Sequence, residues 1–279
     1  MDRKKITIPD LQRMKEEGKK ITMLTAYDYP LALLEDKAGI DIILVGDSVG
    51  MVVLGYESTV PVDMDEMLHH TKAVRRGVKY SFVIGDMPFM SYNITKEESI
   101  RNAGRFIKEC GADAVKLEGG LEVIDTVKSI VRAGISVMGH IGLTPQTASK
   151  LGGFKVQGKD AEGAQRIIDS ALALEEAGCF SVLLECIPDS LAEIITRKLK
   201  VPTIGIGAGI GCDGQVLVTY DLLGLYDRFL PKFVKRYVNL SEEILQGIER
   251  YIEEIQSGKF PTKEHSFTMK EEEIKKLRA

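Results

Sequence analysis

The sequence predicts an α/β protein of the (β/α)8 barrel class, and three observations support that prediction. Eight short apolar runs recur along the chain, and most are continuous stretches of Val, Ile and Leu, which is typical of parallel strands covered by helices. Segments with the apolar spacing of helices lie between these runs. The length of 279 residues also suits a barrel that forms one domain. A doubly wound open sheet is the structural alternative.

The eight candidate strands occupy residues 21–27, 41–46, 81–85, 114–117, 136–139, 181–184, 202–205 and 216–218. The clearest helical segments between them are 121–131 and 160–177, where apolar residues repeat at spacings of three and four. Glycine follows or ends several helical segments, at Gly39, Gly77, Gly111, Gly134 and Gly178. We expect these glycines to adopt the left-handed conformation that often ends a helix.

The pattern changes after the eighth strand. Residues 241–256 are amphipathic with helical period, and residues 263–279 are rich in charge. We expect one barrel domain over residues 1–279, in which 241–279 form a C-terminal helical extension and charged tail. The extension packs either on its own barrel or on a neighbouring subunit, and the sequence leaves both arrangements open.

Composition and charge argue against several classes of partner. The chain has 37 Lys and Arg against 41 Asp and Glu, a net charge of −4, so nothing favours nucleic acid or an anionic membrane surface. The N-terminal segment lacks the apolar region of a signal peptide, and no run of eighteen apolar residues occurs. The four cysteines form no CxxC pair, which favours a reducing, cytoplasmic location over a disulfide framework.

Polar and ionisable residues occur where the predicted strands end. In a barrel, residues at the carboxyl ends of the strands point into one shared pocket. The candidates are Asp47 and Ser48 after the second strand, Asp86 after the third, Lys116 and Glu118 at the end of the fourth, His140 after the fifth and Glu185 after the sixth. These seven residues are therefore predicted to form the functional site.

Each candidate alone has an ordinary structural explanation, since an Asp after a strand usually caps a helix or forms a turn. Their occurrence together in one predicted pocket indicates a functional site. Four carboxylates in one cleft repel each other unless a cation or protons compensate. A hard divalent cation with oxygen ligands, such as Mg²⁺, provides that compensation. We predict that Asp47, Asp86 and Glu118 form the metal group.

The glycine-rich run at 205–214 contains a GxGxxG match at Gly209, Gly211 and Gly214. A strand-like segment follows this run, whereas a dinucleotide site requires a helix there. We therefore expect the glycines to form a tight loop or to let the backbone approach a ligand. Two longer segments, 49–63 and 143–158, are candidates for lids or ligand-binding loops.

Several of these segments together resemble the ketopantoate hydroxymethyltransferase family. The similar runs are TAYD at 25–28, LVGDSVGMVVLGYEST at 44–59, GDMPF at 85–89, VKLEGG at 115–120, GHIGLTPQ at 139–146 and GIGAGIGCDGQVLV at 205–218. They occur in the family's order and spacing from about Lys5 to about Phe260. Only the charged C-terminal tail lies outside the resemblance.

The resemblance implies a (β/α)8 barrel of the phosphoenolpyruvate/pyruvate type that assembles as a homodecamer. It implies transfer of a hydroxymethyl group from 5,10-methylenetetrahydrofolate to 3-methyl-2-oxobutanoate, with Mg²⁺. The product is 2-dehydropantoate (ketopantoate), in the first committed step of pantothenate and coenzyme A synthesis. The partners are then a small 2-oxo acid and a folate.

The resemblance also implies a role for each matching position. Asp47, Asp86 and Glu118 match the family's metal-site acids, and Glu185 matches its proton acceptor. The substrate-binding positions are matched by Asp47, Ser48, Asp86 and Lys116. We expect His140 to bind and orient the substrate or to relay a proton.

Three other functions remain open at this point. The first is a Mg²⁺-dependent lyase acting on a 2-oxo or 2-hydroxy diacid, which would need an acidic cysteine that we do not find near the long loops. The second is a metal-independent aldolase in which Lys116 forms a Schiff base. The third is a non-catalytic barrel that binds folate or an oxo acid, which would not need the base that Glu185 provides.

Overall fold

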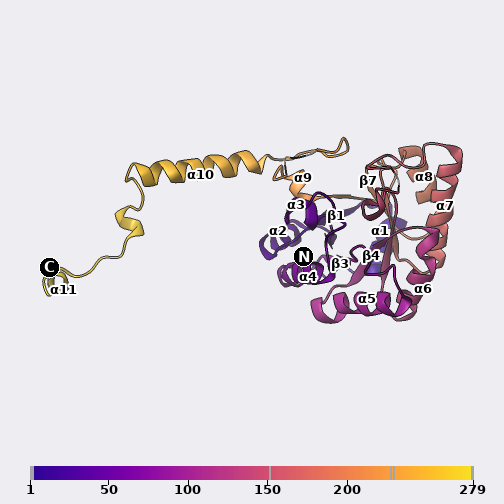
Figure 1. Cartoon of the computed structure of the whole chain (residues 1–279), viewed down its shortest axis with the longest axis horizontal. Coiled ribbons are helices and arrows are strands. Elements are labelled where there is room, and N and C mark those ends of the chain that lie inside the picture. Colours follow the sequence, from indigo (N-terminus) through magenta and orange to yellow (C-terminus); the bar gives the residue numbers. More distant parts are fainter. Residues whose placement is uncertain (1–2, 151, 227, 229, 278–279) are drawn as a thin grey trace.

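The computed structural model describes residues 3–150, 152–226, 228 and 230–277. Eight parallel strands pair in chain order and close into a barrel, because the last strand returns to pair with the first (Figure 1). The strands are β1 (Ile21–Thr25), β2 (Ile42–Val45), β3 (Phe82–Asp86), β4 (Ala114–Glu118), β5 (Val137–Gly142), β6 (Ser181–Glu185), β7 (Thr203–Ile206) and β8 (Gly214–Leu217). All eight predicted strands are confirmed, and the open-sheet alternative is excluded.

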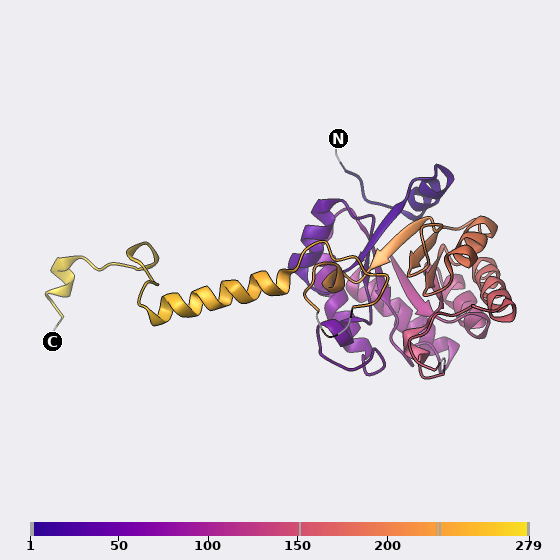
Figure 2. The same cartoon turned by 90° about the horizontal axis from the view of Figure 1, so that it is seen from above.

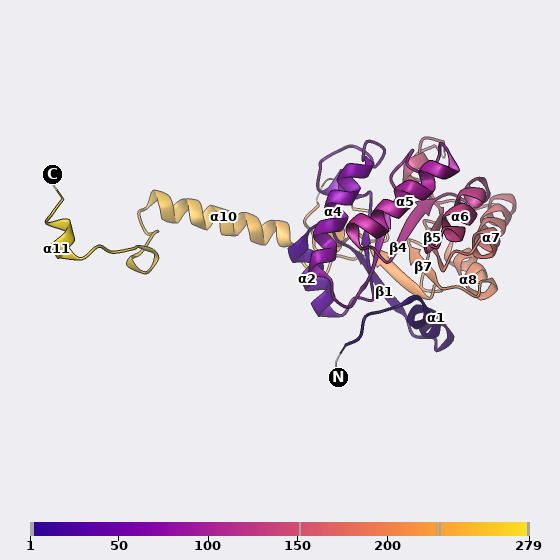
Figure 3. The same ribbon diagram turned by 90° about the horizontal axis from the view of Figure 1, so that it is seen from below.

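Helices surround the barrel on its outside (Figure 3). They are α2 (Tyr29–Ala38), α3 (Val49–Val52), α4 (Met64–Gly77), α5 (Lys96–Cys110), α6 (Ile124–Arg132), α7 (Ala161–Glu176), α8 (Asp189–Lys198) and α9 (Thr219–Leu222). The helix predicted at 160–177 is α7. The one predicted at 121–131 begins as a 3-10 turn, η1 (Leu121–Val123), and continues as α6. A second 3-10 turn, η2 (Pro145–Thr147), follows β5.

Both faces of most strands are buried, which explains the continuous apolar runs; β1 and β8 each expose one residue, Thr22 and Gln215. In β2, Ile42 and Leu44 belong to the cluster inside the barrel, whereas Ile43 and Val45 pack in the layer beneath the helices. Helix α1 (Ile8–Glu16) contributes Leu11 to the inner cluster. This helix closes the amino-terminal end of the barrel, which leaves the carboxyl end for ligands.

The glycines that end helices behave as expected in four of five cases. Gly39, Gly111, Gly134 and Gly178 all have positive φ. The expectation for Gly77 is wrong, because this residue stays in the last turn of α4 and the next residue is extended. A Cβ at Gly77 would lie 2.7 Å from the backbone oxygen of Tyr29. Gly77 is therefore required by the close packing of α4 on α2.

The C-terminal extension leaves the barrel. Helix α10 (Leu240–Gln256) projects away from it and is followed by η3 (Lys263–His265) and α11 (Glu271–Ile274) (Figures 1 and 2). No residue of α10 is buried, so the extension does not pack on its own barrel. Its apolar residues Ile244, Leu245, Ile248, Tyr251, Ile252 and Ile255 are 44–58% exposed. Among the described helices, none combines the length and the hydropathy needed to cross a lipid bilayer.

Candidate active site

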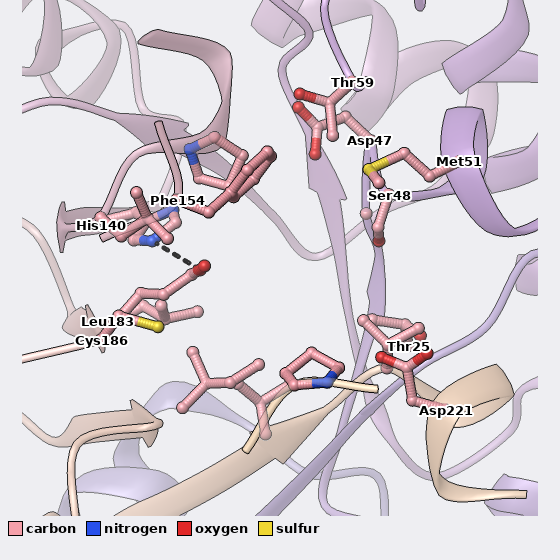
Figure 4. A pocket seen from close by; sticks show the side chains of 18 of the residues that line it. Thr25, Asp47, Ser48, Met51, Thr59, His140, Phe154, Leu183, Cys186 and Asp221 are labelled. Carbon is pink, nitrogen blue, oxygen red and sulfur yellow. Dashed lines mark ion pairs between the residues drawn. The ribbon is translucent and has the colours of Figure 1, made fainter. Parts of the chain in front are cut away.

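A cavity of about 370 Å³ opens at the carboxyl end of the barrel, a size suited to a small-molecule site. All seven predicted site residues line it: Asp47, Ser48, Asp86, Lys116, Glu118, His140 and Glu185. Asp47, Ser48 and Thr59 lie on one side of the cavity, and His140 lies on the opposite side (Figure 4). The prediction that these positions share one pocket is confirmed.

The strand register brings the charged side chains into contact. Asp86 pairs with Lys116 across β3 and β4, and Glu118 pairs with His140 across β4 and β5. His140 was expected just beyond the fifth strand, but β5 continues to Gly142 and includes it. The longer strand fixes the backbone of His140, so the imidazole is held more rigidly than a loop would hold it.

Lys116 forms a buried ion-pair group at the bottom of the cavity. Its Nζ lies 2.9 Å from Asp86 Oδ1 and 3.7 Å from Glu118 Oε1. Burial alone would lower the pKa of Lys116, but the charges of Asp86, Glu118 and Asp47 outweigh it and hold the pKa above its ordinary value. Lys116 is therefore an ammonium ion at neutral pH.

The carboxylates of Asp47 and Asp86 carry excess negative charge for a buried location. Burial, followed by the charges of Asp86 and Glu118, raises the pKa of Asp47 well above its usual range. Burial also raises the pKa of Asp86, although Lys116 opposes the shift. Asp86 Oδ1 is near Lys116 but accepts no well-aligned hydrogen bond from the described residues, so the contact is electrostatic.

These observations fit a divalent cation held by two carboxylates. Such an ion would relieve the repulsion between Asp47 and Asp86, and Mg²⁺ in proteins usually takes one or two carboxylates and completes its shell with substrate and water. The described residues contain no group of three or more His, Cys, Asp or Glu side chains arranged to hold a metal. Glu118 Oε2 instead accepts a hydrogen bond from the Gln146 backbone at 3.0 Å. A direct Glu118 ligand stays a prediction.

His140 lies between two acids. Its Nδ1 is 3.5 Å from Glu118 Oε1, and its Nε2 is 3.2 Å from Glu185 Oε2 (dashed in Figure 4). The second contact is electrostatic, since Nε2 has no well-aligned hydrogen bond among the described residues. Burial and Lys116 lower the pKa of His140, but the two glutamates outweigh them and raise it to about 9. Its Nδ1 also lies 3.1 Å from Lys116 Nζ, so the imidazole links the Lys116 group to Glu185.

The two candidate loops both reach the cavity. Met51, Val52 and Thr59 come from the segment 49–63, while Leu143, Pro145, Phe154, Lys155 and Val156 come from the segment 143–158. Their predicted role in ligand binding is supported by this position. Ser48 is held from behind, because the Tyr27 hydroxyl lies 2.8 Å from its Oγ.

The glycine-rich run forms the connection between β7 and β8 and packs on α8. A Cβ at Gly209 would lie 2.4 Å from Asp189 Cβ, and one at Gly214 would lie 2.6 Å from the backbone oxygen of Ile21. Strand β8 follows the run directly, so no helix amino terminus is available for a pyrophosphate. The tight-loop interpretation is confirmed.

Sequence reasoning missed several residues of the site. Cys186 and Asp221 line the cavity, and Gln146 lies beneath it in contact with Asp47. Because Cys186 directly follows Glu185 in the sequence, its position at the cavity could have been predicted. Asp221 lies in α9, four residues beyond the end of the last strand, and so has no strand-end pattern. Burial and then Glu185 raise the pKa of the Cys186 thiol to about 12, so this thiol keeps its proton at neutral pH and is a weak proton donor.

Comparison with known proteins agrees with the resemblance stated above. The family model of ketopantoate hydroxymethyltransferase matches residues 5–263. A 3-methyl-2-oxobutanoate hydroxymethyltransferase of Moorella thermoacetica is 61% identical over 265 residues, covering 95% of this chain and 98% of that protein. The one from Carboxydothermus hydrogenoformans is 57% identical over 277 residues, covering 99% of this chain and all of that protein.

The solved structures extend the likeness at the level of the fold. The crystal structure of 2,3-dimethylmalate lyase, a member of the PEP mutase/isocitrate lyase superfamily, has a TM-score of 0.57 and 13% identity, and the match covers 96% of each chain. The (β/α)8 barrel fold is therefore shared with this structure. With a family model that spans nearly the whole chain and relatives above 55% identity, the chain belongs to the ketopantoate hydroxymethyltransferase family.

Proposed function

We propose that this chain transfers a hydroxymethyl group from 5,10-methylenetetrahydrofolate to 3-methyl-2-oxobutanoate and forms 2-dehydropantoate, for pantothenate synthesis. The observation that carries the proposal is the convergence of two groups in one cavity. Asp47, Asp86 and Lys116 form a charged floor, and Glu185 lies beside it with His140. The first group suits a 2-oxo acid and the second suits proton removal.

The floor of the cavity binds and polarises the substrate. Asp47 and Asp86 would hold Mg²⁺, with Glu118 completing the acidic group, and the ion supplies Lewis-acid stabilisation of negative charge on the ketone oxygen. Lys116, held as a cation, pairs with the substrate carboxylate or with that oxygen. The Ser48 hydroxyl, positioned by Tyr27, donates a further hydrogen bond to the carboxylate. Charges placed in advance in this way act most strongly where water is excluded.

Glu185 removes the proton from C3 of the substrate. Its side chain is 16% exposed, at the end of β6 and within the cavity. The imidazole of His140 holds the Glu185 carboxylate in place. The resulting enolate carbon attacks the methylene carbon of the folate, and one of the two bonds from that carbon to folate nitrogens breaks as the new bond forms. Water then replaces the second nitrogen. The C3 proton and one proton of the water end on the two nitrogens, which leaves the hydroxymethyl product and tetrahydrofolate.

The three alternatives lose support. A Schiff base requires a neutral amine, whereas the acidic neighbours of Lys116 keep its ammonium form. The diacid lyase would need an acidic cysteine, and the raised pKa of Cys186 disfavours that role. A non-catalytic binding barrel has no use for a carboxylate that points at the substrate position.

We also propose that the chain works as a homo-oligomer in the cytoplasm. The exposed apolar face of α10 is the supporting observation, since a single helix that presents six large apolar residues to water is stabilised by packing on another chain. A decamer is the state that family membership favours. The barrel is the one folding domain in this proposal, and residues 241–279 are its contact arm. A reducing compartment suits its four thiols.

Proton NMR of 3-methyl-2-oxobutanoate in D₂O tests the proposal. With the protein and Mg²⁺ but no folate, we expect the C3 proton signal to disappear, and EDTA should prevent its loss. Addition of 5,10-methylenetetrahydrofolate should then yield 2-dehydropantoate. Failure to form this product with all components present would reject the proposed function.

A further inference from the structure

Gln146 is a buried glutamine whose side-chain amide and backbone N–H are all hydrogen-bonded. It belongs to η2, in the loop after β5, and is 3% exposed. Its Nε2 donates to Asp47 Oδ2 at 2.8 Å and to the backbone oxygen of Met87 at 3.0 Å. Its Oε1 accepts from the Tyr92 hydroxyl at 2.6 Å, and its backbone N–H donates to Glu118 Oε2 at 3.0 Å. A glutamine with this many partners is fixed in one orientation.

The partners also determine which way the amide faces. The backbone oxygen of Met87 can only accept, so the amide nitrogen must face it, and the amide oxygen then faces Tyr92. The Tyr92 hydroxyl must therefore donate to Gln146. The same hydroxyl lies 3.2 Å from the backbone N of Glu118, from which it accepts. Tyr92 thus determines the orientation of an amide that in turn holds Asp47.

These bonds join four of the loops around the cavity. Asp47 follows β2, Met87 and Tyr92 follow β3, Glu118 ends β4, and Gln146 follows β5. The amide donates to one of the two oxygens of Asp47. Without it, the Asp47 carboxylate would face the charges of Asp86 and Glu118 with one hydrogen bond fewer and would turn away from them.

We propose that Gln146 is a positioning residue that sets the carboxylates of Asp47 and Glu118 for the divalent cation, and that Tyr92 acts through it. The inference rests on the metal-dependent function proposed above. Gln146 touches no reacting atom in this assignment. Its effect is to hold two acids, 71 residues apart in the sequence, at the geometry that the cation requires. Groups that orient metal ligands typically change metal affinity by about 10- to 100-fold when they are removed.

The test compares Gln146→Met and Tyr92→Phe with the wild-type full-length protein. Gln165→Met is the matched control, because exposed Gln165 also donates to an aspartate, at 2.7 Å from Asp169 Oδ1 on the surface of α7. Binding is measured with Mn²⁺ alone, from the electron paramagnetic resonance signal of the free ion, so that no turnover is needed. Melting curves and circular dichroism establish that each variant is folded.

We expect Gln146→Met to weaken Mn²⁺ binding by about 10- to 100-fold and Tyr92→Phe to weaken it less. The double variant should lose less affinity than the sum of the two single losses, because both substitutions act on the Gln146 amide. In turnover, the Mg²⁺ requirement should rise while the KM for the folate stays unchanged.

Wild-type Mn²⁺ affinity in folded Gln146→Met overturns the inference and leaves the proposed function intact. If Gln146→Met does not fold, wild-type Mn²⁺ affinity in folded Tyr92→Phe overturns the inference in its place. A wild-type protein that binds no Mn²⁺ would instead reject the metal-dependent function itself.

Discussion

The Nε2 atom of His140 lies 3.2 Å from Oε2 of Glu185, whereas Lys116 pairs with Asp86 and Glu118. His140 and Glu185 come from neighbouring strands, β5 and β6, and the side chain of Glu185 remains accessible from the cavity. The site therefore has two parts. Asp47, Asp86 and Glu118 form the acidic group that we propose to bind the cation, and Glu185 is the acid that we propose to exchange a proton with the substrate.

Replacing the carboxylate of Glu185 should remove the base. Glu185→Gln keeps the size of the side chain and its contact with His140, but the amide cannot accept the C3 proton. We expect the rate of C3 deuterium exchange and kcat to fall by about 10²–10⁴-fold, the usual contribution of a general base. Glu162→Gln, on an exposed side chain of α7, is the control. Exchange at the wild-type rate in Glu185→Gln would exclude this residue as the base.

Removing the metal should have a comparable effect. EDTA should abolish exchange and added Mg²⁺ should restore it, and in Asp86→Asn we expect a loss of about 10²-fold or more that Mg²⁺ does not restore. The thermal shift produced by Mg²⁺ in the wild type should also disappear. Asp125→Asn, whose side chain is 77% exposed, should behave as the wild type. A full Mg²⁺ response in Asp86→Asn would mean that other groups bind the ion.

Glu35 should make stability depend on pH. It is buried on α2, where Thr219 Oγ1 donates to it at 2.9 Å, and burial raises its pKa from 4.5 to about 8. Between these values the folded state keeps a proton that the unfolded state has released. Stability is therefore lost as pH rises from about 4.5 to about 8.

The side chain introduced by Glu35→Gln is neutral in the folded and unfolded states, so this variant lacks the loss of stability that Glu35 causes as the pH rises. We expect its Tm to exceed that of the wild type at pH 8.5 and to approach it at pH 5. Differential scanning calorimetry at these two values measures the change, and Glu122→Gln, on an exposed residue, is the control. An equal pH dependence of Tm in both proteins would show that Glu35 ionises in the folded state as it does in water.

The apolar face of α10 should be required for assembly. Ile248→Glu with Ile252→Glu places two charges on that face, so we expect a smaller mass by light scattering coupled to gel filtration. Gln246→Glu with Arg250→Glu introduces the same residues at the same spacing on the polar side and should leave the mass unchanged. If the Ile248 and Ile252 variant keeps the wild-type mass, the subunits associate through another surface.

The strands and the strand-end residues could be predicted because both are local signals. A strand buried on both faces must be apolar throughout, as in Ile42–Val45, and the barrel topology then places every strand end at one mouth. The side-by-side placement of Lys116 and Glu118 follows from the two-residue period of a strand. For that reason seven residues spread over 139 positions of sequence could be assigned to one cavity.

The residues that were missed depend on tertiary contacts that leave no local pattern. Gln146 lies in a loop where a glutamine is ordinarily exposed, and its bonds to Asp47 and Met87 span 99 and 59 residues. Gly77 has the sequence context of a left-handed helix end, yet the approach of Tyr29 from another helix explains it. The direction of α10 likewise depends on what it contacts rather than on its own amphipathic pattern.

Helix α1 gives the barrel one closed end, and this has a kinetic consequence. Asp86 and Lys116 are almost completely buried, whereas Phe154 at the rim of the cavity is 59% exposed. Under the proposed function two reactants share one mouth, and the oxo acid would lie beneath the folate. We therefore expect the oxo acid to bind first and the spent folate to leave first. This expected order would follow from the placement of nine residues near the start of the chain.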